Sequence, residues 1–526
     1  MKSAGFKSVL FLLAMLAKFA YGNDTTLYDV KHYDIHVSVN IDSQSISGYN
    51  VMQCLMLKSS SVLYCDLVPS MTVSGVTCRQ VPLKFIRKQN KVIVTLETPA
   101  KTGEIIPLNI QFNGKPEVAI LAPWKGGFDW KKDARGKDWV GLACESKGAS
   151  IWLPCKDEWS DEAESMDMYL TVPQSLIGVS NGRLKEVIQT GTETTYHWQV
   201  LNPINNYNIS INIGDYVLIS DTFRGLNTLS LDYYVLSYNK EKAIRHFKEV
   251  DTMLRAFEHY FGAYPFPEDG YKLVETPYWG MEHQSCVAYG NKYRYNEFGF
   301  DFIIVHESGH EWFANSITAA DPADLWIHES FTTYSEALYV EYTQGKEKAL
   351  SYLLSQRGKV MNKYPMQGPK HQHYHGWKDN DIYYKGSWVL QTLRYSVNND
   401  SLWFNMLREM GAKFRHQLIS SEEMVEFICK RLPGIKRPVL DQYLNYSDLP
   451  FLYVKLIRGK GTQWLEYRWA ADVKNFSMDL PVQTSKGTVV LRAGKSKRKT
   501  KVPADFTLND ILKLKEHALI NVGVQE

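Results

Sequence analysis

Two histidines four residues apart place the strongest constraint on how this chain folds. His306 and His310 form the pattern HExxH, with Glu307 directly after the first of them. Residues four apart on an α-helix lie on one face about one turn apart, so both imidazoles can reach a single ion. The apolar run Phe302–Val305 precedes the pattern and indicates that the helix is buried. We therefore expect a helix over residues 302–317 that presents two metal ligands.

A carboxylate follows at a distance that fits the same site. Eighteen residues separate Glu329 from His310, and Glu329 opens a second helical run. If that helix packs antiparallel to the first, His306, His310 and Glu329 can hold one Zn2+ and leave a fourth position open to water, as in catalytic zinc sites. Glu307 would flank that water as a general base. Other divalent ions also fit such ligands, and a solvated helix that carries these residues by chance is the alternative.

The character of the sequence changes twice along the chain. Residues 28–217 are strand-like, and Tyr33–Val39 alternates polar and apolar side chains as a half-buried strand does. Helical patterns, beginning with one over residues 240–260, dominate to about residue 440. Strands return from residue 449. The pattern predicts a multidomain α+β chain with an N-terminal antiparallel β domain (23–217), an α-rich domain (218–444) and a small C-terminal β-sandwich-like domain (445–526).

The first 22 residues have the features of a signal peptide. Lys2 and Lys7 are basic, and Val9–Ala17 is apolar but too short to span a bilayer as a helix. Ala20 and Gly22 fit a small-x-small cleavage site, so we expect cleavage after Gly22. A buried N-terminal helix is the alternative. No later apolar stretch has transmembrane length, which predicts an exported protein, periplasmic or extracellular, without a transmembrane segment.

Composition excludes several classes of protein. Hydrophobic residues make up 44% and charged residues 22% of the chain, which is normal for a globular protein and excludes general disorder. The net charge of +3 gives no reason to expect a nucleic-acid partner. The seven cysteines include no CxxC pair, so we expect mostly structural thiols with one or two bridges. The basic run KSKRKTK, at residues 495–501, is expected to form a solvated hairpin, with an acidic-surface contact as the alternative.

The metal-binding pattern and its surroundings resemble a known family. HExxH, eighteen residues and then Glu form the zinc signature of the gluzincin aminopeptidases, which include aminopeptidase N and leukotriene hydrolase. Residues 312–315, WFAN, resemble that family's WFGN, and residues 325–334, LWIHESFTTY, resemble its LWLNEGFATY. The resemblance implies a thermolysin-like zinc catalytic domain behind a β domain. It also implies a short form without a full C-terminal helical domain, so no arginine is assigned to the substrate carboxylate.

A segment before the metal pattern resembles the family's substrate-binding strand. Residues 278–283, YWGMEH, are similar to the motif GxMEN, an edge strand that lines the cleft. By position, Glu282 would bind the free α-ammonium group of the substrate, and Gly280 and Met281 would line the cleft. The segment departs from the motif at Trp279 and His283. A tryptophan at that place would crowd the cleft or shape a side-chain pocket.

Two further segments carry family positions. The segment CESKGASIWLPCKD resembles a β-domain stretch whose acid or amide after the cysteine is the second amine anchor, which places Glu145 beside Glu282. Residues 383–386, YYKG, resemble YxKG, whose tyrosine donates to the oxyanion of the tetrahedral intermediate. That register assigns the catalytic tyrosine to Tyr383, with Tyr384 as its rival. A surface carboxylate and a packing tyrosine are the structural alternatives for these positions.

The resemblance implies a zinc-dependent aminopeptidase that acts on peptides with a free N-terminus. Holding a cationic amine between carboxylates near a metal fixes the chain end, so that one residue fits before the scissile bond. Three alternatives remain open: an epoxide or other non-peptide hydrolase on the same scaffold, a zinc endopeptidase, and an inactive binding module. The sequence does not predict side-chain preference, oligomeric state or the partners of the ligating histidines.

Overall fold

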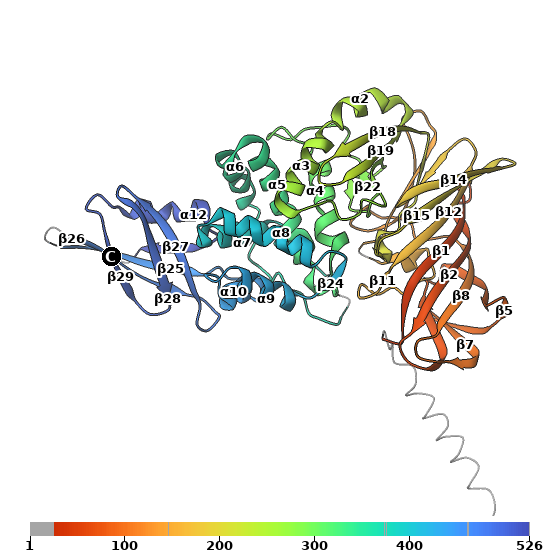
Figure 1. The fold of residues 1–526 in the computed structure, drawn as a ribbon, viewed down its shortest axis with the longest axis horizontal. Coiled ribbons are helices and arrows are strands. Elements are labelled where there is room, and N and C mark those ends of the chain that lie inside the picture. The colour runs from red at the N-terminus through yellow and green to blue at the C-terminus, as the bar shows by residue number, and fades with distance from the viewer. Residues whose placement is uncertain (1–25, 146, 373, 375, 460–461, 525–526) are drawn as a thin grey trace, which may run out of the picture.

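The computed structural model describes all residues except 1–25, 146, 373, 375, 460–461 and 525–526. Three parts lie in a row along the long axis, with the N-terminal β domain at one end and the C-terminal β domain at the other (Figure 1). The predicted signal peptide lies outside the described residues. Within the part that is described, no helix is both long enough and apolar enough to cross a membrane.

The N-terminal domain is built from β-sheets. Its eight-stranded sheet has the order β14 (Arg183–Thr190), β15 (Glu193–Val200), β12 (Ser165–Pro173), β1 (Tyr28–Asn40), β2 (Ser45–Met56), β8 (Ile105–Gly114), β4 (Met71–Cys78), β5 (Val81–Pro82). A three-stranded sheet has the order β3 (Ser60–Asp66), β7 (Lys91–Ala100), β6 (Lys84–Lys88). Two smaller sheets have the orders β13 (Ile177–Val179), β17 (Asn212–Gly214), β10 (Asp138–Ala143), β9 (Gly127–Lys132), and β11 (Glu162–Ala163), β16 (Ile204–Asn205). Short 3-10 turns complete the domain, η1 (Ala149–Ile151) and η2 (Asn206–Asn208).

The alternation predicted for the first strand is confirmed. Tyr33, Ile35, Val37 and Val39 are buried, while the residues between them are partly exposed. Neighbouring strands of the large sheet pair antiparallel, except that β1 and β12 run parallel. Parallel neighbours need a long crossover, and the strands between β1 and β12 in the sequence supply it.

The second domain, which the resemblance implies to be the catalytic domain, combines a mixed sheet with helices. The sheet order is β18 (Tyr216–Arg224), β19 (Thr228–Leu236), β20 (Tyr271–Glu275), β22 (Val287–Tyr289), β21 (Gly280–Met281), and the expected domain boundary at residue 217 falls inside β18. The helices are α2 (Lys240–His246), α3 (Glu249–Phe261), α4 (Phe302–Gly309), α5 (Trp326–Gln344), α6 (Lys346–Arg357), α7 (Tyr384–Val397), α8 (Asp400–Lys413), α9 (Ser421–Arg431) and α10 (Arg437–Asn445). Smaller elements are η3 (Ser237–Asn239), η4 (Glu311–Ser316), η5 (Pro322–Asp324), β23 (Ile317–Ala319) and β24 (Gln417–Ile419).

Two predicted helices are shorter in the structure. The helix expected over residues 240–260 is interrupted at Phe247 and Lys248, where α2 ends and α3 begins. The helix expected over residues 302–317 ends at Gly309 and continues into the distorted turn η4. The apolar pattern continues through both breaks because buried side chains follow them. The backbone departs from the helix only locally, at Phe247 in the first break and at Phe313 and Ala314 in the second.

Helix α5 lies at the centre of the catalytic domain. Its residues from Trp326 to Val340 are all buried, so this helix is covered on every side. Helix α4 lies beside it and begins at Asp301, whose side chain accepts hydrogen bonds from the backbone N–H groups of Ile303 (3.0 Å) and Ile304 (3.4 Å). Such an N-cap satisfies donors that the first helical turn leaves free. The start of the metal-binding helix is thereby fixed by a side chain next to it.

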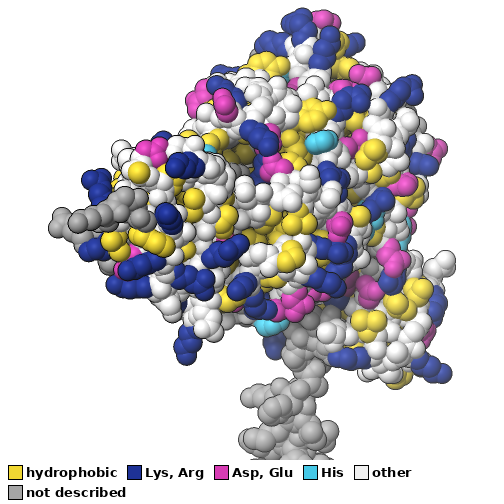
Figure 2. Space-filling model, turned by 60° about the vertical axis from the view of Figure 1, so that its left-hand side comes forward, with side chains coloured by type: hydrophobic (Ala, Val, Ile, Leu, Met, Phe, Trp, Pro, Cys, Tyr) yellow, Lys and Arg dark blue, Asp and Glu magenta, His cyan; other side chains and the backbone are white. Residues whose placement is uncertain are grey.

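The C-terminal domain packs two sheets and two short helices. Its strands are β25 (Phe451–Gly459), β26 (Thr462–Ala470), β27 (Ser477–Thr484), β28 (Gly487–Gly494), β29 (Arg498–Val502) and β30 (Asn521–Val524), with α11 (Leu508–Leu512) and α12 (Leu514–His517). The basic run 495–501 forms the exposed turn after β28 and most of β29. Lys497 and Lys499 form ion pairs with Glu466 at 3.1 and 3.4 Å. Figure 2 shows many Lys and Arg side chains on this lobe, which comes forward at the left.

The cysteines differ from the expectation in one respect. All seven lie among the described residues as free thiols, so the one or two expected bridges are not formed there. Five of them are buried in the N-terminal or catalytic domain. These domains have extensive apolar cores, so they close without cross-links.

Candidate metal centre and active site

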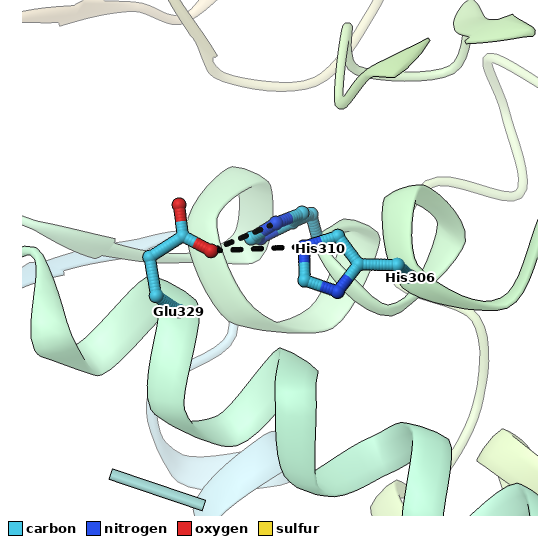
Figure 3. A group of neighbouring side chains, drawn as sticks. All are labelled: His306, His310 and Glu329. Carbon is cyan, nitrogen blue, oxygen red and sulfur yellow. Dashed lines mark ion pairs between the residues drawn. The ribbon is translucent and has the colours of Figure 1, made fainter. Parts of the chain in front are cut away.

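The structure brings the three predicted metal ligands together. His306 lies within α4, His310 directly follows its last residue, and Glu329 lies in the first turn of α5. One carboxylate oxygen of Glu329, Oε2, lies 3.7 Å from His306 Nε2 and 3.5 Å from His310 Nε2 (Figure 3). Tetrahedral bonds of about 2.0–2.1 Å to one ion would hold such atoms about 3.3 Å apart. The spacing therefore fits a zinc-sized cation.

The burial of these groups also fits a metal ion. Both imidazoles and the Glu329 carboxylate are buried, and Glu329 Oε2 has no hydrogen-bond partner among the described residues. A buried carboxylate oxygen without a partner is costly. A cation between the three side chains would satisfy it, and three protein ligands leave a coordination position for water or substrate.

The second nitrogen of each imidazole has its own partner. His306 Nδ1 lies 2.6 Å from Glu336 Oε1. His310 Nδ1 lies 2.9 Å from the carbonyl oxygen of Phe313 and 3.1 Å from Thr332 Oγ1. When Nδ1 carries the proton and donates, the lone pair of Nε2 is left for the metal. Both histidines are thus held in the tautomer that binds a metal ion through Nε2.

The end of α4 explains how Phe313 becomes a partner of His310. Phe313 (φ −119°, ψ 82°) and Ala314 (φ 151°) leave the helical conformation. The Phe313 carbonyl turns away from the helix axis and accepts from His310 Nδ1, which a continuing helix would prevent. Ala314 stands in a backbone region that favours glycine, and the resembling family motif WFGN has glycine there.

Glu336 is a site residue that sequence reasoning left unassigned. It lies seven residues after Glu329, close to two helical turns, so both face the same side of α5. Its other oxygen accepts a hydrogen bond from the Tyr352 hydroxyl and one from Gln356 Nε2 at 3.1 Å. Helical periodicity could have identified the shared face, but not the histidine that meets it.

We expect Glu336→Ala to weaken zinc binding by about 10–100-fold, because carboxylates that orient ligating histidines contribute about this much. Glu347→Ala, an exposed glutamate on α6, is the matched control. Zinc affinity is measured by competition with a chromogenic chelator. Equal affinity in the two variants would show that the bond from Glu336 to His306 does not support the metal site.

Glu307 stands next to the ligands with its carboxylate toward the cleft. It is buried, and burial, opposed by His306, raises the pKa of the carboxyl to about 7. A Cβ on Gly280 would lie only 2.6 Å from Glu307 Oε1. The glycine therefore lets the carboxylate approach the strand that lines the cleft, and a group of this pKa can both accept and return a proton near neutral pH.

The segment that resembles a substrate-binding strand is an edge strand in the structure. Gly280 and Met281 form β21, which pairs only with β22 at the end of the sheet and lines the cleft. Glu282 follows directly and is buried. Its side chain accepts a long hydrogen bond from the Tyr207 hydroxyl (3.4 Å), and its backbone oxygen accepts one from Asn315 Nδ2 (2.8 Å). The residue is thus held from both domains, its carboxylate by the N-terminal domain and its backbone by the second domain.

Glu145 reaches the same cavity from the N-terminal domain. It follows β10 and lines the cavity together with Glu282, Glu307 and the metal ligands. Burial raises the pKa of the Glu145 carboxyl to about 8, and the nearby Glu329 and Glu307 add to the effect. Burial, and then Glu145, raises the pKa of Glu282. Each carboxylate would be stabilised by a cation placed between them.

The cavity as a whole favours cations. It holds about 380 Å3 and lies between the two domains. Five glutamates and one aspartate are among the described residues that line it, and none of those residues is a lysine or arginine. An ammonium group and a metal ion can both be bound here, whereas an anionic ligand would meet like charge.

The rival tyrosines point to different neighbours. The ring of Tyr383 lies 6.2 Å from that of His306 between centroids, and burial and the nearby Glu329 raise the pKa of its hydroxyl. The hydroxyl of Tyr384 instead accepts a hydrogen bond from Lys359 Nζ at 3.3 Å. Tyr383 is therefore the one placed beside the metal ligands.

The two residues that depart from the motif, His283 and Trp279, differ in their exposure. His283 is fully buried, neither ring nitrogen has a partner in the described structure, and burial lowers its pKa to about 3, so the ring is neutral. Trp279 lies at the mouth of the cleft and is 44% exposed. Trp124, Trp159 and Tyr207 of the N-terminal domain also lie at the site, and no local pattern in the sequence marked them.

Family models match both large domains. The Peptidase M1 N-terminal domain matches residues 29–207, and the Peptidase family M1 domain matches residues 246–441. The chain belongs to peptidase family M1. The predicted resemblance is confirmed, and so is the predicted order of a β-rich domain followed by a helical catalytic domain.

Curated M1 relatives are distant and longer. Endoplasmic reticulum aminopeptidase 1 of Mus musculus is 20% identical over 447 residues, covering 79% of this chain and 47% of its own length. Glutamyl aminopeptidase of Rattus norvegicus is 22% identical, covering 61% of this chain and 36% of its own. The chain spans about half the length, or less, of these two relatives.

A solved M1 structure shares the fold over nearly its whole length. The M1 zinc metallopeptidase of Deinococcus radiodurans aligns with a TM-score of 0.68 and 22% identity, covering 80% of this chain and 94% of that one. A structure described as a two-domain M1 zinc metallopeptidase bound to L-tryptophan aligns with a TM-score of 0.70. At this identity the likeness shows the fold.

Proposed function

We propose that this M1-family chain is a zinc-dependent aminopeptidase that hydrolyses the N-terminal residue from peptides. The observation that carries the proposal is the position of Glu282 and Glu145 in the cavity that holds the three metal ligands. Two buried carboxylates beside a metal site are suited to bind an α-ammonium group. A peptide whose amine is held there would present its first peptide bond to the metal.

The side chains around the cavity supply the remaining steps. Zinc bound by the three ligands would polarise the scissile carbonyl and make its water more acidic. Glu307 accepts a proton from the attacking water and passes it to the leaving amine as the peptide bond breaks. Tyr383 donates a hydrogen bond to the carbonyl oxygen as it gains negative charge. Glu282 and Glu145 hold the substrate amine, so only the first peptide bond is presented.

The names of the relatives agree with this proposal. Endoplasmic reticulum aminopeptidase 1, glutamyl aminopeptidase and aminopeptidase B are M1-type relatives of this chain. Only the name of glutamyl aminopeptidase states a preferred residue, and this chain matches only part of the length of each relative. The site geometry therefore supports the reaction class, while the preferred residue depends on this chain's own pocket walls.

A panel of aminoacyl arylamides, each with its N-acetylated counterpart, tests the proposal. We expect release of the arylamine only from free-amine substrates, loss of activity with a chelator, and recovery with zinc. Glu282→Gln should raise KM by roughly tenfold or more, because it removes a charge from the pair that binds the ammonium group.

The same panel separates the alternatives. Equal cleavage of the acetylated substrates would contradict the amine-binding role of Glu282 and indicate an endopeptidase. Cleavage of neither set, with zinc bound, would favour a non-peptide hydrolase such as an epoxide hydrolase on the same scaffold. In the described residues the three ligands, Glu307 and Tyr383 are all in place, which favours a hydrolase over an inactive binding module.

We also propose that the protein is exported, to the periplasm or the extracellular space. The basic residues, the short apolar run and the cleavage site before Asn23 support this. Sequencing the N-terminus of protein secreted by an expressing cell should give Asn23 as the first residue, and retention of Met1 would contradict the proposal.

A further inference from the structure

An unbroken row of aromatic rings leads from the metal site to the surface. Phe302 stacks on His306, with ring centroids 5.1 Å apart and planes 20° apart. Trp279 stacks on Phe302 at 5.3 Å and 20°. Trp124, from the N-terminal domain, meets Trp279 at 6.1 Å and 48°. Phe302 and both tryptophans line the same cavity as the metal ligands.

Trp279 and the proposed amine anchor Glu282 flank the edge strand β21 at its opposite ends. Glu282, Glu307 and His310 each offer one potential metal-ligand atom, and these three atoms lie within 4.8 Å of one another. The aromatic row begins instead at His306. Three residues of extended strand span about 10 Å, so a peptide whose amine is bound at Glu282 and that runs along β21 brings its second residue toward Trp279 and the stacked ring of Phe302.

The outer rings are held in place but remain accessible. Trp279 is 44% exposed and Trp124 is 52% exposed, although most large aromatic side chains of the protein are buried. Trp279 Nε1 donates to Asn291 Oδ1 at 3.2 Å. The loop that carries Trp124 is closed by a hydrogen bond from the Lys125 N–H to the Leu121 carbonyl at 2.8 Å. Rings fixed in this way lose little conformational entropy when they bind a ligand.

The segment just before Trp124 carries further exposed apolar side chains. Val118, Ile120 and Leu121 are all more than half exposed, and Ile120 reaches 77%. Exposed apolar side chains that continue from a binding cleft are typical of surfaces that receive a ligand. Their position favours an extended substrate over a single amino acid.

We propose that Trp124, Trp279 and Phe302 form an aromatic slot that binds the side chain of the substrate's second residue and selects for aromatic or large apolar residues there. The proposal rests on the proposed aminopeptidase function and adds a specificity for the leaving part of the peptide. Trp279 stands where the family motif has glycine, and no motif marked Trp124. The slot forms where the two domains meet.

Tripeptides that differ only at the second residue test the slot. We use Ala-Trp-Ala, Ala-Leu-Ala and Ala-Gly-Ala, and measure release of the N-terminal alanine by the zinc-loaded enzyme. We expect kcat/KM for Ala-Trp-Ala to exceed that for Ala-Gly-Ala by roughly tenfold or more, since contacts between aromatic rings and their burial contribute on this scale. Most of the difference should be in KM.

Variants assign the preference to the rings. Trp124→Ala and Trp279→Ala should each lower the ratio of the two kcat/KM values several-fold, with a small effect on Ala-Gly-Ala. Trp124→Ala is the safer variant, because its ring lies in a loop of the other domain and away from β21. Trp464→Ala is the matched control, a tryptophan 40% exposed on the C-terminal sheet at the far end of the molecule.

The outcomes distinguish this proposal from the proposed function. Release of alanine from all three peptides at equal kcat/KM would leave the aminopeptidase in place and overturn the slot. The slot would also be overturned if the Trp124 and Trp279 variants kept the wild-type ratio. If no peptide is cleaved, the aminopeptidase function fails first, and the slot as a substrate site fails with it.

Discussion

Glu307→Gln is expected to lower kcat by about 10²–10⁴-fold, the usual contribution of a positioned general base. The amide has nearly the shape of the carboxylate, so it fits beside Gly280, but it cannot accept the proton of the attacking water. His306, His310 and Glu329 are untouched, so zinc should remain bound. KM should change little because Glu282 and Glu145 still hold the substrate amine. Steady-state kinetics on a free-amine substrate, with the zinc content of the same preparation, checks this.

Zinc content decides how the result is interpreted. Loss of activity with one zinc ion per chain is the expected combination. A variant that loses zinc as well would indicate a packing defect around α4 and would not report on proton transfer. Activity close to that of the unmodified protein, with zinc bound, would show that another group takes the proton and that the role assigned to Glu307 is wrong.

Tyr383→Phe is expected to lower kcat by about 10²–10³-fold, the range for removing one donor to the developing oxyanion. The ring stays and still packs beside His306, so only the hydroxyl is lost. The substrate is bound before the oxyanion forms, so KM should stay within a few-fold of the original value. A transition-state mimic with a tetrahedral oxyanion should bind correspondingly less tightly to the variant.

Tyr384→Phe is the matched control, because it removes the same atom from the next residue. The hydroxyl of Tyr384 faces Lys359, so this variant should keep nearly full activity. The reverse result, with Tyr384→Phe impaired and Tyr383→Phe active, would transfer the donor role to Tyr384. Equal small effects would remove a tyrosine hydroxyl from the reaction altogether.

The metal site shows why some features can be predicted from the sequence. Two histidines four apart on a helix share a face in any protein, because helical geometry is local. The spacing to Glu329 was informative because α5 is the next α-helix after α4 in the sequence. In the structure the Glu329 carboxylate lies close to both histidines. The alternation of β1 and the order of the domains follow from patterns of the same local kind.

Features that depend on non-local packing could not be predicted from the sequence. The partner of His306 is Glu336, and this contact depends on the register of α4 against α5. The break after Gly309 turns the Phe313 carbonyl toward His310. The residues after the break are still buried, so the sequence there looks like a continuing buried helix. Conformational details of this kind depend on the surrounding tertiary structure, which local propensity does not encode.

From the sequence by itself came the predictions of the metal ligands, of Glu307 as general base, of the edge strand with Glu282, and of the succession of β, helical and β regions. The tertiary structure decided which residues complete the site: Glu336 behind the metal, Tyr207 against Glu282, and Trp124 beside Trp279 at the mouth. The physical reason is the range of the interactions. Helix and strand periodicity act over a few residues, whereas the cavity forms where two separately patterned domains pack against each other.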